Sequence, residues 1–201
     1  MKNITIFGKM LCKYRIGKKD IADINKKYEQ AKNNLDGYGA RLAGRIDSEL
    51  DMTKLIDKTK AWGKIIKCMQ HYINHAIQFE LSHVEKIHLN VEGCWINDMV
   101  EREYNPPHTH HDGGGHSVVM FLKVPNFIND AKDPHKFKDG QLGFISECGT
   151  YSKFIQPVVG DFYIFAANHQ HYVLPFKTKT PNEVRRSMSF NFTAHDKVTN
   201  V

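Results

Sequence analysis

Six short runs of β-branched and aromatic residues fill the second half of the chain and limit its fold more than any other feature. The runs are IHLNVEGCWINDMV, SVVMFLKVP, QLGFISE, FIQPVVGDFYIFAAN, HYVLPF and RRSMSFNFTAH. Clusters of Gly, Pro, Asn and Asp separate them, as turns separate strands. Many short strands in succession predict a barrel or a sandwich. We therefore expect a β core over residues 86–201.

The first part of the chain has a helical pattern instead. Apolar side chains recur at steps of three and four from Asp20, the expected N-cap, to Leu35, and again over about 53–81. These helices should pack on one face of the β core. Residues 1–85 would then be a mainly helical part of one compact domain.

The net charge of +6 is unevenly distributed. Residues 1–90 hold 17 basic and 10 acidic side chains, whereas the remainder is close to neutral. A basic half can indicate a nucleic-acid partner, but no basic run with interleaved aromatic residues supports one. A solvated, lysine-rich helical surface explains the excess better.

Three sequence patterns that do not occur predict the cellular compartment of the protein and the redox state of its cysteines. No run of about 18 apolar residues occurs, so we expect no membrane span. Residues 1–19 are too polar for the core of a signal peptide. We expect a cytoplasmic protein, in the host cytoplasm if the chain is viral. The four cysteines show no CxxC spacing, which favours free, partly buried thiols.

Metal-binding residue types are concentrated between two predicted strands, in the segment NPPHTHHDGGGHS. Imidazole nitrogens and a carboxylate suit Fe(II), Mn(II) or Zn(II). His110 and Asp112 form an H-x-D unit, in which two side chains separated by one residue can reach the same ion. The glycines that follow allow a tight turn beside it.

A second histidine segment and an arginine-containing strand further along the chain support the prediction of a metal site. His169 and His171 come directly after the strand DFYIFAA, where a second histidine completes a facial triad of two histidines and one carboxylate. Further on, Arg185 and Ser187 lie two residues apart and point the same way in a strand. A guanidinium and a hydroxyl on one face can hold a carboxylate. Arg186 should point to the opposite face.

With these motifs in order, the chain resembles the 2-oxoglutarate/Fe(II)-dependent oxygenases, in particular those assigned in tailed-phage and marine bacterial genomes. The resemblance lies in NPPHTH, SVVMFLKVP, GDFYIFAANHQHYVLPF and RRSMSFNF. It covers roughly residues 86–195, and more loosely the segment Leu42-Ala43-Gly44. It implies a double-stranded β-helix, a jelly-roll barrel like that of cupins. It also implies Fe(II) and the cosubstrates 2-oxoglutarate and O₂.

The resemblance assigns roles but leaves one ligand pair open. His110, Asp112 and His171 would hold iron, and Arg185 and Ser187 would hold the 5-carboxylate of 2-oxoglutarate. HYVLPF matches the H-x-V-x-P text of the family, which favours His171 over His169. Many relatives show H-x-H in the first segment, so His108 with His110 is the alternative pair.

The expected reaction is hydroxylation of a primary substrate with release of succinate and CO₂. The substrate can be a protein side chain such as prolyl, a nucleobase or a small metabolite, and no motif selects among them. The oligomeric state is equally open. A cupin-like metal-binding barrel, or a non-catalytic binding module on the same fold, is the alternative. Arg185 and Ser187 argue against both, because neither needs a carboxylate clamp.

Overall fold

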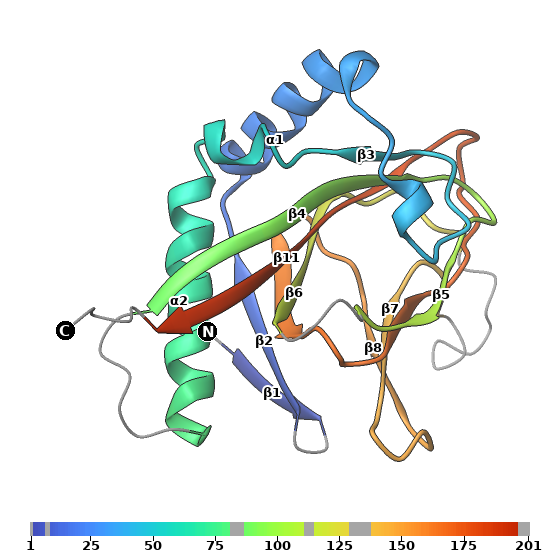
Figure 1. The fold of residues 1–201 in the computed structure, drawn as a ribbon. Coiled ribbons are helices and arrows are strands. Elements are labelled where there is room, and N and C mark those ends of the chain that lie inside the picture. The colour runs from blue at the N-terminus through green and yellow to red at the C-terminus, as the bar shows by residue number, and fades with distance from the viewer. Residues whose placement is uncertain (1, 7–8, 81–86, 111–114, 129–137, 197–201) are drawn as a thin grey trace.

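Two antiparallel sheets and two helices make up the protein in the computed structural model, which describes residues 2–6, 9–80, 87–110, 115–128 and 138–196 (Figure 1). The larger sheet has the strand order β1-β2-β9-β6-β11-β4-β3, and the smaller sheet β5-β10-β7-β8. The strands of the larger sheet are β1 (Lys2–Ile6), β2 (Lys9–Arg15), β3 (Glu49–Asp51), β4 (Ile87–Met99), β6 (His116–Lys123), β9 (Asp161–Ala166) and β11 (Arg185–Asp196). Those of the smaller sheet are β5 (Asn105–His108), β7 (Leu142–Ile145), β8 (Ser152–Ile155) and β10 (His171–Val173).

The larger sheet separates two hydrophobic clusters because side chains alternate along its strands. In β6, Val118 and Met120 pack towards the helices α1 (Lys18–Ala31) and α2 (Trp62–Glu80). Val119 and Phe121, one residue further on, pack between the two sheets. The helices and the smaller sheet consequently lie on opposite sides of the larger sheet (Figure 1). This is the expected mostly β core, arranged as a double-stranded β-helix with helices on one face.

All six predicted β runs contain strands, and the structure adds four more. β1, β2 and β3 come from the part of the chain expected to be mainly helical, and they extend both edges of the larger sheet. β5 contains Pro106 and Pro107, which cannot donate backbone hydrogen bonds. The strand is nevertheless compatible with them, because it lies at the edge of its sheet. The division of the chain at residue 85 stays a prediction.

Both predicted helices form, but each begins elsewhere than expected. α1 starts at Lys18 with Gly17 as its N-cap, and the Asp20 carboxylate instead binds Lys64 Nζ at 2.7 Å. α2 starts only at Trp62. The preceding residues are held against β4, where the backbone N–H of Met52 donates to the carbonyl of Cys94 at 2.8 Å.

Two other expectations can be compared with the structure. The cysteines are free thiols, as predicted: Cys12 and Cys94 are buried, Cys68 is half-buried and Cys148 is exposed. Among the described residues, no helix combines the length and the apolar character that a membrane crossing requires.

Arg186 joins the larger sheet to α1 on the side away from the smaller sheet, as the strand alternation predicts. Its guanidinium makes a double ion pair with Asp98 of β4 at 2.5 and 2.6 Å and bonds Glu29 of α1 at 2.8 Å. It also lies over the ring of Tyr28, 4.3 Å from the ring centroid. Arg186 and Asp98 are largely shielded from solvent, with side chains 3% and 13% exposed, whereas Glu29 lies at the surface.

Replacing Arg186 by Met should lower the free energy of unfolding by about 3 kcal/mol, because Asp98 is left with an uncompensated charge. Urea unfolding followed by circular dichroism measures the change. Lys64→Met removes a cation that is 62% exposed from its ion pair with Asp20, and it should cost less, about 1 kcal/mol. Equal losses in the two variants would contradict the role given to Arg186.

Candidate metal centre and active site

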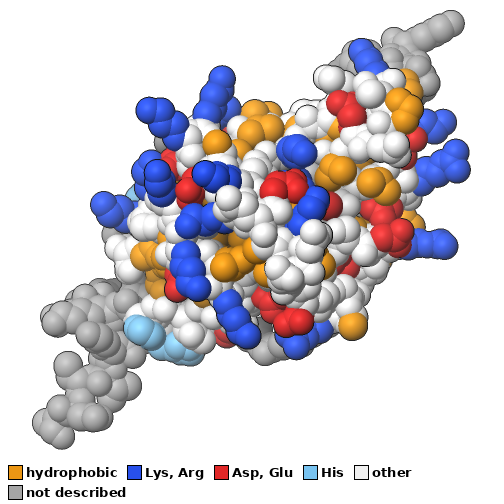
Figure 2. Space-filling model, turned by 90° about the horizontal axis from the view of Figure 1, so that it is seen from above, with side chains coloured by type: hydrophobic (Ala, Val, Ile, Leu, Met, Phe, Trp, Pro, Cys, Tyr) orange, Lys and Arg blue, Asp and Glu red, His pale blue; other side chains and the backbone are white. Residues whose placement is uncertain are grey.

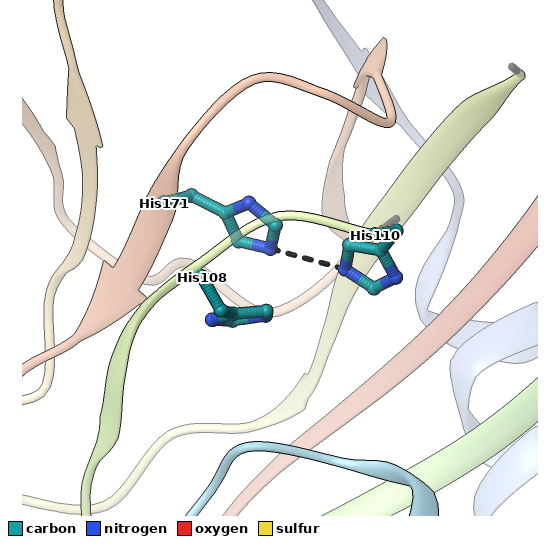
Figure 3. Close-up of side chains that lie close together, drawn as sticks. All are labelled: His108, His110 and His171. Carbon is teal, nitrogen blue, oxygen red and sulfur yellow. Dashed lines mark hydrogen bonds between the residues drawn. The ribbon is translucent and has the colours of Figure 1, made fainter. Parts of the chain in front are cut away.

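Three histidines from two segments about 60 residues apart meet at one end of the smaller sheet. His108 ends β5 and His171 begins β10, and the two are direct cross-strand partners. His110 follows β5, and its backbone N–H donates to the carbonyl of Ala167 at 2.9 Å. Figure 3 shows the three imidazoles turned towards a common space. One potential ligand atom from each lies within 4.8 Å of the others.

The Nδ1 hydrogen bonds of His108 and His171 leave the Nε2 atoms of these two rings without a proton. Nδ1 of His108 is 2.8 Å from the carbonyl of Pro106, and Nδ1 of His171 is 2.9 Å from the carbonyl of His169. A carbonyl can only accept, so both Nδ1 atoms carry the proton and both Nε2 atoms present a lone pair. His110 Nε2 lies 3.4 Å from His171 Nε2. Such anchoring through Nδ1 is typical of histidines that bind a metal.

Burial keeps two of these imidazoles uncharged. His171 is 3% exposed and packs against Phe165 and Phe144. Burial, and then the neighbouring histidines, hold the pKa of His171 well below its usual value. Burial also lowers the pKa of His108. Neutral imidazole is the form that coordinates a divalent cation.

Asn191 also bonds His110, and no sequence pattern had identified it as a residue of the site. Its Nδ2 donates to His110 Nδ1 at 3.0 Å, and its Oδ1 accepts from Ser117 Oγ at 2.8 Å. When His110 uses Nε2 as a ligand, its proton moves to Nδ1. The Asn191 amide can turn over to accept that proton, because its two ends exchange donor and acceptor. The alternation of β11, with polar side chains at 185, 187, 189 and 191, was the available signal.

Other sequence candidates lie outside this group. Asp112 and His111 fall outside the described residues, so the structure does not choose between Asp112 and His108 as the third ligand. His169 is 1% exposed and its ring lies against Phe144, 5.1 Å between ring centroids. It does not belong to the three-histidine group.

Arg185 lies on the inner face of β11, between the two sheets. It is 0% exposed; Nε donates to the carbonyl of Gly140 at 2.9 Å and Nη1 contacts Met99 Sδ at 3.5 Å. Its guanidinium also lies 5.2 Å from the ring centroid of Phe121. Among the described residues, Nη2 has no hydrogen-bond partner. Burial lowers the pKa of Arg185 to about 10, so the group is still charged at neutral pH.

A buried cation without an anion is costly, which makes Arg185 a candidate to bind an anionic ligand. Met99 Sδ is a weak acceptor, and a carboxylate could replace it. Ser187, 3% exposed, lies two residues along the same strand and lines a narrow cavity of about 30 Å³. Met99 and the three histidines line the same cavity.

A second, larger cavity of about 440 Å³ lies on another side of His108 and His110. Both cavities share Trp95 and Leu42 in addition to these two histidines. The histidines therefore separate a narrow cavity near Ser187 from a wider one. A metal held by them would be reachable from both.

Comparison with known proteins agrees with this arrangement. The family model described as "Putative 2OG-Fe(II) oxygenase" matches residues 93–191, which include the three histidines, Arg185 and Ser187. A prolyl-4-hydroxylase from Pseudomonas putida has a similar structure, with a TM-score of 0.60 and 16% identity over 91% of each chain. No match to a curated protein sequence reaches significance.

Two further prolyl hydroxylases share the fold. One, from Trichoplax adhaerens in complex with a hypoxia inducible factor peptide, has a TM-score of 0.59 and 13% identity over 91% of this chain and 83% of its own. The other, a viral collagen prolyl hydroxylase from Paramecium Bursaria Chlorella virus-1 in complex with 2OG, has a TM-score of 0.54 and 12% identity over 91% and 96%.

The chain matches the 2-oxoglutarate/Fe(II)-dependent oxygenase family over residues 93–191, about half of its length, and shares the fold of prolyl hydroxylases. It is an oxidoreductase of the dioxygenase kind, and Fe(II), 2-oxoglutarate and O₂ are the cofactor and cosubstrates of this family. The donor set fits iron, because three imidazoles converge at one point.

Replacing Asn191 by Leu should weaken Fe(II) binding at least about tenfold, because His110 loses the group that orients it. Asn191→Asp should retain binding, since a carboxylate also accepts the Nδ1 proton. Anaerobic isothermal titration calorimetry with Fe(II) measures both affinities. If Asn191→Leu bound iron as tightly as the unmodified protein, Asn191 would have no part in orienting His110.

Proposed function

We propose that the enzyme hydroxylates a carbon atom of its primary substrate, with iron held by His108, His110 and His171. Arg185 and Ser187 hold the 5-carboxylate of 2-oxoglutarate. The observation that carries this proposal is the convergence of the imidazoles at the cavity that Ser187 lines. Ser187 is on the same strand as Arg185, whose Nη2 has no hydrogen-bond partner among the described residues. Asp112 remains the alternative to His108, as the sequence pattern favoured.

The proposed reaction couples the decarboxylation of 2-oxoglutarate to hydroxylation of the primary substrate. With iron in place, 2-oxoglutarate, O₂ and a C–H bond are converted to succinate, CO₂ and an alcohol. The histidines position the metal, and their Nδ1 bonds prevent the rings from turning. Arg185 supplies a fixed cation in a site from which water is excluded, where it binds a carboxylate more strongly than at the surface.

Prolyl residues of a polypeptide are the first substrate to test. The similar structures named above are prolyl hydroxylases, and one of them contains a peptide. A nucleobase and a small metabolite are the other substrate classes. A nucleic-acid partner gains little support from the surface in Figure 2, where Lys and Arg side chains are interspersed with Asp and Glu.

Anaerobic titration with Fe(II) and 2-oxoglutarate tests the cosubstrate site, because chelation of iron by the ketoacid gives a charge-transfer band in the visible region. Arg185→Met should raise the 2-oxoglutarate concentration needed for this band about a hundredfold, as loss of one partner of a buried charge pair costs ~3 kcal/mol. The variant should stay folded, since it removes an unpaired buried charge. Arg102→Met, at an exposed arginine, is the control. Iron binding without any band would favour a cupin-like or non-catalytic barrel.

A pair of variants decides the third ligand. His108→Ala should lower Fe(II) affinity by at least about a hundredfold if the three imidazoles hold the metal, because loss of a ligand exceeds loss of an outer partner. Asp112→Ala should then bind iron nearly as well as the unmodified protein. Calorimetry that gave the reverse order would assign the site to His110, Asp112 and His171.

A further inference from the structure

The 440 Å³ cavity beside His108 and His110 has the size of a ligand site and no assigned occupant. Besides residues 108–110, His116 and Ala167, three parts of the chain line it. One is the segment 38–43, which follows α1; the others are β4 around Gly93 and β11 at Asn191. Its occupant would lie next to two of the candidate metal ligands.

A bulge in β4 turns two consecutive residues towards this cavity. Asn191 of β11 pairs with Gly93, but the next residue, Phe192, pairs with Val91, so Glu92 is left without a partner in the ladder. Bulges of this kind redirect side chains and are common beside active sites. Glu92 and Gly93 both line the cavity as a result.

Tyr38 lies over this bulge in a position that only a glycine allows. Its ring stacks on Trp95, with 4.9 Å between centroids and an interplanar angle of 5°. A Cβ atom at position 93 would lie 2.3 Å from the Tyr38 hydroxyl oxygen, but 3.3 Å from the next nearest atom, Cζ of the same ring. Among the described residues, the structure shows no hydrogen bond from this hydroxyl. Tyr38 therefore brings a free donor and acceptor to the cavity wall.

The segment that carries Tyr38 is held firmly in place. The backbone N–H of Tyr38 donates to the carbonyl of Glu49 at 2.7 Å. The Glu49 side chain, 4% exposed, lies under the segment, where a Cβ at Gly39 would be 2.9 Å from its carboxylate. This wall belongs to the part of the chain before β4, which we call the arm (residues 9–80), and it is hydrogen-bonded to β3.

The charges around the cavity favour an uncharged occupant. Burial lowers the pKa of His116 to about 4, so this lining residue is neutral at physiological pH. Apart from the histidines, the charged lining residues within the described chain are one cation, Arg41, and one anion, Glu92. Both are exposed, and Arg41 lies 5.2 Å from the ring centroid of Tyr38. A phosphate-rich ligand would need more cations than this.

We propose that the cavity binds an extended polypeptide segment and places one of its uncharged side chains beside the metal. A peptide backbone offers carbonyl acceptors and N–H donors, and the rim offers Arg41 as a donor and Glu92 as an acceptor. The Tyr38 hydroxyl, which lines the same cavity, would supply a further bond to that backbone. The inference rests on the proposed function, whose own failure is visible as loss of the charge-transfer band.

The substrate class is tested by succinate release from the Fe(II)-loaded enzyme with 2-oxoglutarate and O₂. Pools of short randomised peptides should raise the rate several-fold above the level without added substrate. Oligothymidylate and free nucleosides should not. Stimulation by the nucleic-acid probes instead, or by none of the probes in an enzyme that shows the band, would overturn the proposal.

The location is tested with Tyr38→Phe, Gly93→Ala and the double variant. Tyr38→Phe should lower kcat/KM for the active peptide pool about fivefold, the worth of one hydrogen bond. Gly93→Ala should lower it further, because the new methyl group displaces Tyr38. The double variant should return to the level of Tyr38→Phe, since the close contact involves the hydroxyl oxygen.

The charge-transfer band should be unchanged in all three variants, which separates this site from the metal and cosubstrate sites. Additive losses in the double variant would show that the contact between Tyr38 and Gly93 is not what matters. Unchanged kcat/KM in both single variants would exclude the cavity as the peptide site.

Discussion

The alternation of side chains along β11 is the constraint on which the rest of the structure depends. The strand is hydrogen-bonded to β4 on one side and to β6 on the other, so each residue must face either the helices or the smaller sheet. Arg186 faces the helices, where acidic side chains neutralise it. Arg185 faces the inner side, where the described residues provide no anion. Of two adjacent arginines, Arg186 is therefore held by ion pairs, and Arg185 is the one that we propose binds a ligand.

The candidate metal centre depends on a much smaller element. β5 and β10 are short edge and inner strands of the smaller sheet, and their pairing sets His108 beside His171. Two prolines in β5 remove donors that an edge strand does not need. The larger sheet then completes the site, since Asn191 reaches His110 from β11. The smaller sheet supplies His108 and His171, and the larger sheet supplies Asn191.

The arm adds to the shared fold the walls that would determine the substrate. The double-stranded β-helix with its metal and carboxylate sites is shared with enzymes of different substrates, so substrate choice must come from the added walls. Here Tyr38 reaches the cavity because β3 joins the larger sheet beside β4. Gly93 leaves the space that the phenol occupies. Substrate recognition would therefore depend on contacts between segments more than 50 residues apart.

Some of these features are visible in the sequence because they depend on residue type and local spacing. The strand runs, the helical faces and the different directions of Arg185 and Arg186 follow from periods of 2 and 3.6 residues, and the histidine cluster follows from residue type. No local pattern in the sequence marked Tyr38 as a residue of the cavity. Asp20 is of a type that favours an N-cap, but its carboxylate binds Lys64 instead.

The sequence by itself therefore determined the class of fold and the chemical groups of the site. Only the tertiary structure showed that His108 lies beside His110 and His171, that Asn191 bonds His110, and that residues 38–43 line the larger cavity. Such contacts depend on strand pairing and packing between distant segments, and local periodicity does not encode which distant segments meet.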